Sequence, residues 1–317
     1  MDDERFRGES GTEAAAGGQG PHRPLSLLAA RLGILAAAVL FSSGGAAIKS
    51  VHLSGWQVAG TRSGIAALAL LALLPRARRL PRARDLAVAV VFAVTMVLFV
   101  LANKLTTAAS TIFLQDTSPL YVVLLAPLLL KEPLRRRDLP FIAVLAAGMT
   151  LFFVGLDPTS ATAPDPLRGD LLALLSGLAW AGTVIGLRFL GRAGGSSASA
   201  TVWGNLIACL AGLAMALPLA VPRPGDWAIL VYLGTCQIGV AYYFLTRALE
   251  VVPALEAALL LLLEPVLNPI WAWIVHGERP SAWSLAGGAV ILAATGVKSW
   301  VDVRGPRPQP PESVALS

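Results

Sequence analysis

Two stretches of the chain carry the same pattern: LTTAASTIFLQDTSPLYVVLLAPLLLKEP (residues 105–133) and ALEAALLLLLEPVLNPIWAWIVHGERP (residues 254–280). In the first stretch, Pro119 lies near the middle of an apolar run, and Glu132 ends that run thirteen residues later. In the second, Pro265 and Glu278 occupy the same places, again thirteen residues apart. Each Glu opens a turn into a further apolar segment that contains glycines. This recurrence indicates an internal repeat.

Apolar segments of about 17 to 25 residues fill the chain between about residues 32 and 303, with short turns rich in Arg, Pro and Gly between them. Of all residues, 56% are hydrophobic and 14% are charged, and the mean hydropathy is +0.68. About 20 apolar residues at 1.5 Å rise cross a ~30 Å hydrocarbon layer. We therefore predict an all-α membrane protein with ten transmembrane helices. They cover about residues 32–48, 55–74, 86–103, 106–130, 139–156, 170–189, 200–220, 227–245, 253–275 and 283–301.

The repeat divides the chain into two units. Matching Pro119 to Pro265 places the first five predicted helices, residues 32–156, over the last five, residues 169–303. Because five is odd, the second copy must cross the membrane in the opposite sense, which gives a 5+5 inverted-topology repeat. Residues 1–31, polar and rich in Gly and Ala, and residues 304–317, rich in Pro, are expected to be disordered cytoplasmic tails.

Lys and Arg accumulate in cytoplasmic loops, so their distribution predicts the orientation. With both termini in the cytoplasm, 19 of the 25 basic residues lie on the cytoplasmic side and five on the outer side, with Arg62 inside the membrane. The net charge of +6 reports this topology. A nucleic-acid partner has little support, because the basic residues lie in loops too short to form a docking domain.

Several function classes lack their sequence signals. The chain has no GxxxxGK[ST] phosphate loop and no turn long enough for a nucleotide-binding domain. His22, His52 and His276 are scattered and form no HExxH motif, and no aspartate cluster is spaced to hold Mg²⁺. Cys209 and Cys236 both lie within predicted helices, where packing explains them. We therefore expect no cofactor, no metal and no enzymatic activity.

Several segments resemble the EamA-like transporters of the drug/metabolite transporter superfamily. The resemblance rests on residues 105–133 and 254–280, on GDLLALLSGLAW (169–180), and on SGGAAIK and TRSG in the first two predicted helices. It covers about residues 32–301. It implies a ten-helix carrier that moves small metabolites, often outward, by alternating access. It also implies a cavity enclosed by helices one to four and six to nine, with helices five and ten outside.

Arg62 is the first candidate for a functional role. It lies about eight residues into the second predicted helix, roughly 12 Å below the outer surface at 1.5 Å per residue. A lone Arg there costs ~3 kcal/mol or more, so it must face the bundle interior or water. Two interpretations stay open: Arg62 binds an anionic group such as a carboxylate, or it closes an ion pair or caps backbone carbonyls between helices.

Asp116 and Glu264 fall near the midplanes of the fourth and ninth helices, just before Pro119 and Pro265. Proline frees a backbone carbonyl one turn earlier and can open the helix, which is tolerated in a membrane only against protein or a wet cavity. A carboxyl group at such a break could bind substrate or carry a proton during transport. The alternative is a carboxyl group that holds helices together.

Four further residues are candidates for lining a cavity. Trp180 lies near the middle of the sixth helix, and Gln237 and Tyr242 lie in the eighth. Gln115 adjoins Asp116, but successive helical residues point about 100° apart, so both face one cavity only if the turn is distorted. For the three residues in helices six and eight, ordinary packing remains the alternative.

Charged residues at helix ends are expected to have structural roles. Lys49 and Lys104 are expected to extend to water from the outer ends of the first and third helices. Glu132 and Glu278 are expected to fix turns at the membrane surface, and Glu256 to lie at an interface or helix start.

Taken together, the sequence predicts a secondary transporter in a bacterial cytoplasmic membrane that exports a small polar or amphipathic metabolite or drug. Its expected partners are this solute and the lipid bilayer, with coupling to protons as a hypothesis; the oligomeric state stays open. A receptor or scaffold without transport is the alternative, with a pocket accessible from one side only. An intramembrane enzyme is a more distant one.

Overall fold

The computed structural model describes residues 26–129, 136, 138–154, 159–192, 195–248, 251–252 and 254–304. These residues form helices and turns, with no strand among them. The first half contains α1 (Leu27–Ser42), α2 (Gly44–Ser50), α3 (Gly55–Leu73), the 3₁₀ helix η1 (Pro75–Arg78), α4 (Ala83–Leu105), α5 (Ala108–Gln115), α6 (Ser118–Leu129) and α7 (Asp138–Val154). The second contains α8 (Pro166–Arg192), α9 (Ser197–Met215), α10 (Pro224–Tyr232), the π-helix η2 (Leu233–Val240), α11 (Ala241–Ala248), α12 (Ala254–Leu261), α13 (Leu263–His276) and α14 (Ala282–Arg304).

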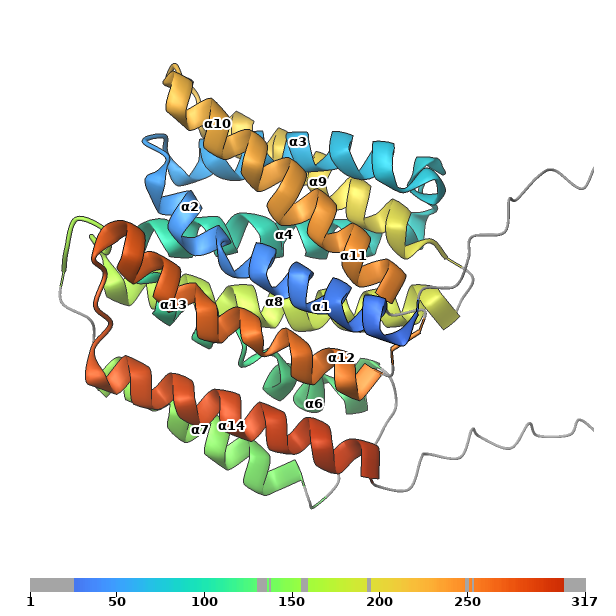
Figure 1. Cartoon of the computed structure of the whole chain (residues 1–317), viewed down its shortest axis with the longest axis vertical. Coiled ribbons are helices and arrows are strands. Elements are labelled where there is room, and N and C mark those ends of the chain that lie inside the picture. The colour runs from blue at the N-terminus through green and yellow to red at the C-terminus, as the bar shows by residue number, and fades with distance from the viewer. Residues whose placement is uncertain are drawn as a thin grey trace, which may run out of the picture.

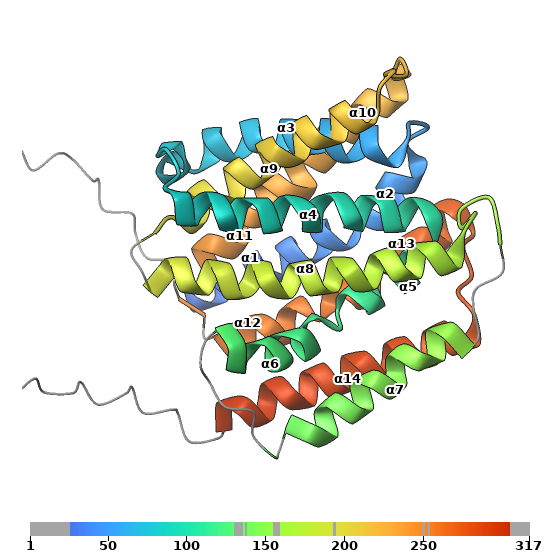
Figure 2. The same cartoon turned by 180° about the vertical axis from the view of Figure 1, so that it is seen from behind.

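The helices lie side by side in one bundle (Figures 1 and 2). The start of α1 and the end of α14 lie at the same end of this bundle, which we call the proximal end. The distal end, opposite to it, is formed by the turns at residues 51–54, 106–107, 159–165, 216–223 and 277–281. A chain whose two ends lie on one side of a membrane must cross that membrane an even number of times.

Among the described residues, seven helices are long and apolar enough to cross a membrane, by length and composition. They are Leu27–Ser50, Gly55–Leu73, Ala83–Leu105, Ala108–Leu125, Pro166–Leu187, Ser197–Met215 and Pro224–Leu245. Two further apolar helices, Asp138–Val154 and Ala282–Lys298, are shorter. The predicted ninth helix is divided into α12 and α13. The chain is thus an all-helical, multi-pass membrane protein, but this measure does not yield the predicted count of ten.

The boundaries also differ from the sequence prediction at the N-terminus. α1 begins at Leu27, with Ser26 as its cap: the Ser26 hydroxyl accepts a hydrogen bond from the Ala29 N–H at 3.2 Å. Helix thus starts five residues before the predicted first span, inside the segment 1–31 that was expected to be a disordered tail. Serine satisfies a free N–H group at the helix start, which explains where α1 begins.

The helix contacts follow the repeat. Matching the two repeats pairs α1 and α2 with α8, and α4 with the segment α10–η2–α11. The contact of α4 with α8 then corresponds to the contact of α11 with α1, and the structure contains both contacts. Likewise α5 packs on α8 as α12 packs on α1, and α6 packs on α8 as α13 packs on α1. α3 packs on its own equivalent, α9. In Figure 1, α1 and α8 run in opposite directions along the bundle. The two halves are therefore related as copies with opposite sense.

Glycines allow the closest of these contacts. A Cβ atom at Gly60 of α3 would lie 2.7 Å from the Leu213 nitrogen, and one at Gly212 of α9 would lie 2.6 Å from the Gly60 nitrogen. Both neighbours are backbone atoms, which cannot move aside. Small residues let helix backbones approach where no hydrophobic effect drives them together. The α3–α9 contact therefore depends on Gly60 and Gly212.

Substituting Gly60 with Ala should lower the stability of the protein, by about 1–3 kcal/mol for overpacking of this kind. Thermal unfolding of the detergent-solubilised protein measures this as a lower melting temperature. Gly225→Ala is the matched control, because nothing lies within 4 Å of a Cβ atom there. Equal melting temperatures for the two variants would contradict the proposed role of the α3–α9 contact.

Candidate functional site

In the first half, a helix interruption positions Asp116. α5 ends at Gln115, and Asp116 is its C-cap, with φ −70° and ψ 0° and its N–H bonded to the Ile112 carbonyl at 2.9 Å. α6 begins at Ser118, so Pro119 lies in its first turn, where a missing N–H group costs nothing. The proline thus favours a new helix start here, and the chain leaves α-helical geometry at Asp116 and Thr117.

A second interruption positions Glu264 in the other half. α12 ends at Leu261, Leu262 is the N-cap of α13 with φ −61° and ψ −11°, and Glu264 and Pro265 lie in the first turn of α13. Both repeats are therefore interrupted next to the prolines that the sequence singled out, and each interruption carries a carboxyl group.

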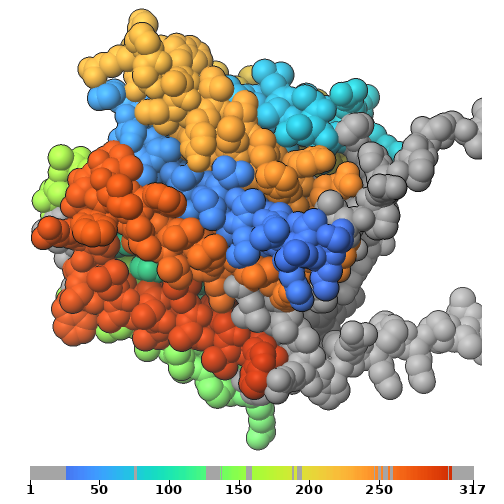
Figure 3. All heavy atoms as spheres, viewed as in Figure 1, coloured from blue at the N-terminus to red at the C-terminus, as the bar shows by residue number. Residues whose placement is uncertain are grey.

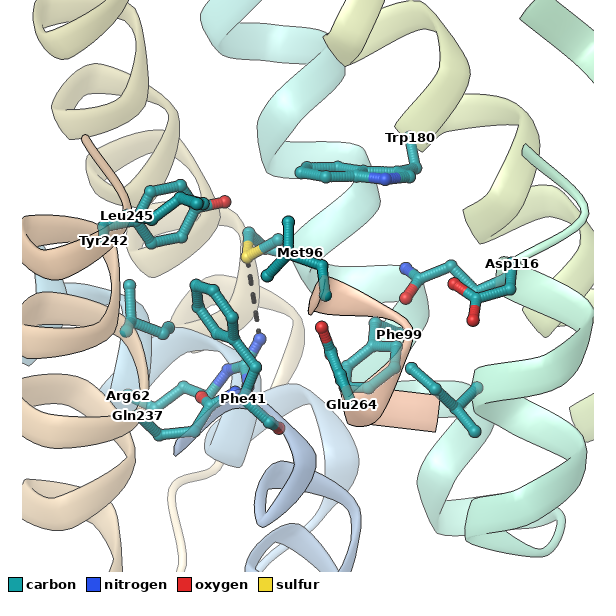
Figure 4. A pocket seen from close by; sticks show the side chains of 14 residues that line it. Phe41, Arg62, Met96, Phe99, Asp116, Trp180, Gln237, Tyr242, Leu245 and Glu264 are labelled. Carbon is teal, nitrogen blue, oxygen red and sulfur yellow. Dashed lines mark hydrogen bonds between the residues drawn. The ribbon is translucent and has the colours of Figure 1, made fainter. Parts of the chain in front are cut away.

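A cavity of about 150 Å³ lies between the two interruptions (Figure 4). Its wall comes from both halves of the chain, and it is formed by Phe41, Arg62, Met96, Phe99, Ile112, Gln115, Asp116, Trp180, Gln237, Ile238, Tyr242, Leu245, Leu261 and Glu264. The seven polar and aromatic candidates from the sequence are all among them. Pro119 and Pro265 are not, and act on the cavity only through the helix geometry that they favour.

Gln115 and Asp116 both line the cavity although they are neighbours in sequence. The distorted turn at Asp116 makes this possible, since a regular helix would point the two side chains about 100° apart. The Gln115 amide Nε2 also donates a hydrogen bond to Ser176 Oγ at 2.8 Å, which ties α5 to α8.

Arg62 is buried in the cavity wall with its residue 2% exposed. Its Nη2 lies 3.7 Å from Met96 Sδ, and its Nε and Nη1 have no hydrogen-bond partner among the described residues. The structural alternative for Arg62 required an ion pair or capped backbone carbonyls, and the described residues contain neither. Figure 4 shows the guanidinium directed toward Met96 at the cavity. A buried cation without an anion is costly, so the arrangement suits an anionic ligand.

Asp116 and Glu264 approach the cavity from different helices, and Figure 4 shows both carboxyl groups directed into it. Both residues are half-buried, and the Glu264 carboxyl lies within electrostatic range of that of Asp116. Within the described residues, neither forms an ion pair with Arg62. The cavity therefore holds one cation and two carboxyl groups that do not neutralise each other by contact.

The other seven residues of the wall, which the sequence did not single out, are all apolar: Phe41, Met96, Phe99, Ile112, Ile238, Leu245 and Leu261. No sequence signal separates them from other apolar residues of the same helices. The π-helix η2, which carries Gln237 and Ile238, was also not predicted. Such helices are rare and are frequent at functional sites. Gly234 of η2 faces α3 closely, because a Cβ atom there would lie 2.6 Å from Ile65 Cβ.

The expected wall needs one correction. The predicted seventh helix, α9, contributes none of the described lining residues. It lies behind α3 and α4, held there by the close contacts of Gly204 with Phe92 and of Gly212 with Gly60. α7 and α14 pack together and also contribute none, as the resemblance implied.

The expectations for helix ends also need correction. Lys49 does not extend to water: its side chain is 2% exposed, and its Nζ donates to the Thr106 carbonyl at 2.6 Å. Glu278 does lie in a turn at the distal end, but its side chain is 3% exposed and accepts a hydrogen bond from the Ala108 N–H at 2.8 Å. Its counterpart Glu132 lies outside the described residues. Glu256 pairs with Arg31.

The two repeats match a known family. The sequence profile of the EamA-like transporter family fits residues 28–154 and, a second time, residues 167–299. The chain belongs to the EamA-like transporter family. The resemblance expected from the sequence is thereby confirmed. The family consists of transporters rather than enzymes.

Individual relatives of this EamA-like protein match only part of it. Three curated proteins named for ethidium bromide resistance, from Escherichia coli, Salmonella typhimurium and Pseudomonas aeruginosa, are each 35% identical to it over 74 residues. The matched stretch is 22% of this chain and 64% of each relative. One solved crystal structure covers 88% of this chain and 99% of its own, with a TM-score of 0.58 and 20% identity, which shows a shared fold.

Replacing Arg62 with Met should leave the melting temperature unchanged or raise it. The substitution removes a buried charge that has no anionic partner and keeps much of the volume, which is neutral or stabilising at buried charged sites. Lys298→Met is the control and should lower the melting temperature, because Lys298 Nζ pairs with Asp138 at 2.9 Å. If Arg62→Met melts as low as Lys298→Met, Arg62 has the structural role instead.

Proposed function

We propose that this protein is a secondary transporter that carries a small solute across a bacterial cytoplasmic membrane by alternating access, in the direction of export. The observation that carries the proposal is the central cavity, in which the helix interruptions of two oppositely directed repeats meet. Arg62, Asp116 and Glu264 line it without an ion pair among the described residues. Cavities of this kind, at the interface of inverted repeats, are where secondary transporters bind substrates and coupling ions.

The proposal includes ten crossings with both termini in the cytoplasm. The start of α1 and the end of α14 share one end of the bundle, which supports an even number of crossings. The predicted orientation follows from the 19 basic residues assigned to that side against five on the other. A divided helix can cross a membrane as α12 and α13 together if the interruption faces a cavity. Under this proposal the distal end of the bundle faces the outside of the cell.

We assign the anionic part of the solute to Arg62. A guanidinium group binds a carboxylate through two parallel hydrogen bonds, and Nε and Nη1 of Arg62 are both without a partner among the described residues. Trp180, Tyr242, Phe41 and Phe99 offer aromatic surface for an apolar part. At about 150 Å³ the cavity is smaller than the roughly 300–1,000 Å³ typical of drug-sized ligands, so it favours a small metabolite in this state.

We assign proton coupling to Asp116 and Glu264. Both carboxyl groups line the cavity and lie within electrostatic range of each other. Two carboxylates that share a site resist ionising together, so one of them can take up a proton on one side of the membrane and release it on the other. The two carboxyl groups would also suit a cationic solute. The similar proteins are named for resistance to ethidium bromide, so ethidium is the first cation to test.

A carboxylate solute should raise the melting temperature of the purified protein more than its neutral amide does. A ligand that binds only the folded state stabilises it by mass action, by ~2.7 kcal/mol at a hundredfold excess over Kd. A thermal-shift screen of small carboxylates, their amides and ethidium measures this. Arg62→Met should abolish the preference for the carboxylate, whereas Lys104→Met, outside the cavity, should keep it. A preference that survives Arg62→Met would assign the anion elsewhere.

Solute flux through the protein in liposomes should respond to an imposed pH gradient. The double variant Asp116→Asn with Glu264→Gln should lose this response, because amides cannot exchange a proton. Glu256→Gln is the matched control, since Glu256 pairs with Arg31 away from the cavity, and it should keep the response. An intact response in the double variant rules out these two carboxyl groups. The absence of any flux, with a ligand bound, would favour a receptor instead.

A further inference from the structure

A buried ion pair joins the two repeats at the distal end. Lys49 Nζ, at the end of α2, lies 3.9 Å from Glu278 Oε2, which follows α13. Lys49 also donates to the backbone carbonyls of Thr106 and Thr162, and Glu278 Oε1 accepts from the Ala108 N–H, the first of α5. Buried charges of this kind are stable only in a well-fixed geometry. The pair therefore ties together α2, the start of α5, the segment that links the two repeats and the end of α13.

A constriction made of buried amides lies next to this pair. At Gly45 of α2, a Cβ atom would lie 2.7 Å from Asn268 Oδ1, 2.9 Å from Ala108 Cβ and 3.1 Å from Asn103 Oδ1. Asn103 and Asn268 are fully buried. In the described part of the chain, Asn103 Oδ1 and both polar atoms of the Asn268 side chain have no hydrogen-bond partner.

Such unsatisfied amides are expensive, at about 1–3 kcal/mol each. They are not needed for packing, since apolar side chains of similar size would fill the same space without this cost. Their cost disappears when the helices separate and water reaches them. The unsatisfied amides therefore indicate that this constriction opens during the transport cycle, since a permanently closed one would carry their cost without a benefit.

Open space lies on both sides of the ion pair and the constriction. The central cavity reaches Phe41 of α1, eight residues before Lys49, or ~12 Å along a helix. Beyond the pair, a second cavity of about 220 Å³ is lined by Thr107, Thr162, His276 and Glu278 at the distal end. The space-filling view shows the distal ends of α2 and α13 close together on the face shown in Figure 3. The ion pair therefore lies between the solute cavity and the distal surface.

We propose that Lys49 and Glu278 form the outer gate of the transport path, with Asn103 and Asn268 as the polar constriction beneath it. For the solute to leave on the distal side, Lys49 must separate from Glu278 and from the Thr106 carbonyl, and Glu278 must release the Ala108 N–H. The charges then become hydrated, which compensates for the lost contacts. This inference rests on the proposed transport function, because a gate matters only if the cavity opens at this end.

Cysteine labelling tests the gate without any solute. In a chain with Cys209→Ala and Cys236→Ala, Ala108→Cys places a single thiol at the constriction, and a membrane-impermeant maleimide is added to intact cells. Lys49→Met and Glu278→Gln should each accelerate labelling roughly tenfold, because each removes a charge-assisted hydrogen bond that holds the gate shut. Lys104→Met, which removes another distal lysine whose Nζ donates to the Val51 carbonyl, should leave the rate unchanged.

A second reporter separates opening of the gate from unfolding. Ala66 of α3 is fully buried among Leu70, Val202 and Ile238, away from the constriction. Ala66→Cys should stay unlabelled in the Lys49 and Glu278 variants. The gate is ruled out if labelling at Ala108→Cys does not change, if Lys104→Met accelerates it equally, or if Ala66→Cys is labelled as fast. Accelerated labelling without solute flux would count against the transport proposal alone, and flux with unchanged labelling against the gate alone.

Discussion

In a hydrocarbon layer every backbone N–H and carbonyl group must find a partner within the protein, and the arrangement of this molecule depends on that constraint. A helix that crosses lipid can be interrupted only where the freed groups face protein or a wet cavity. In each repeat this chain interrupts the helix that carries the repeated proline, at Asp116–Thr117 and at Leu262. Since the repeats pack with opposite sense, both interruptions meet in the interior. The cavity between them is the consequence, and the carboxyl groups of Asp116 and Glu264 reach it because they lie at the interruptions.

The same constraint divides the polar residues of the helices into two groups. At the distal end, Lys49 and Glu278 satisfy each other and several backbone groups, and they hold segments of both repeats together. Arg62, by contrast, has no such partner in the described residues. A protein that kept every charge paired would gain stability but would have no group left to bind a charged solute. The contrast between Lys49 and Arg62 is the physical basis for separating a gate from a binding site.

Sequence reasoning selected polar residues that line one cavity, because polar side chains inside lipid are costly and had to face the interior. Their roles in transport stay predictions. Arg62, Asp116 and Glu264 were found in this way, and the helix interruptions followed from Pro119 and Pro265. It failed where the outcome depends on a neighbour distant in sequence. Lys49 was expected to reach water, since nothing in its own helix shows that the Thr106 carbonyl and Glu278 enclose it. α9 was expected to line the cavity, but the close backbone contact between Gly60 and Gly212 places α9 behind α3.

The central claim is that the cavity at Arg62, Asp116 and Glu264 opens alternately to the two sides of the membrane. Reactivity of a single cysteine at Leu245, in the cavity wall, tests it most directly in a chain without Cys209 and Cys236. An impermeant thiol reagent should label Leu245→Cys both in intact cells and in inside-out vesicles, and a bound solute should slow both reactions. Labelling from one face alone, at any solute concentration or pH gradient, would contradict alternating access.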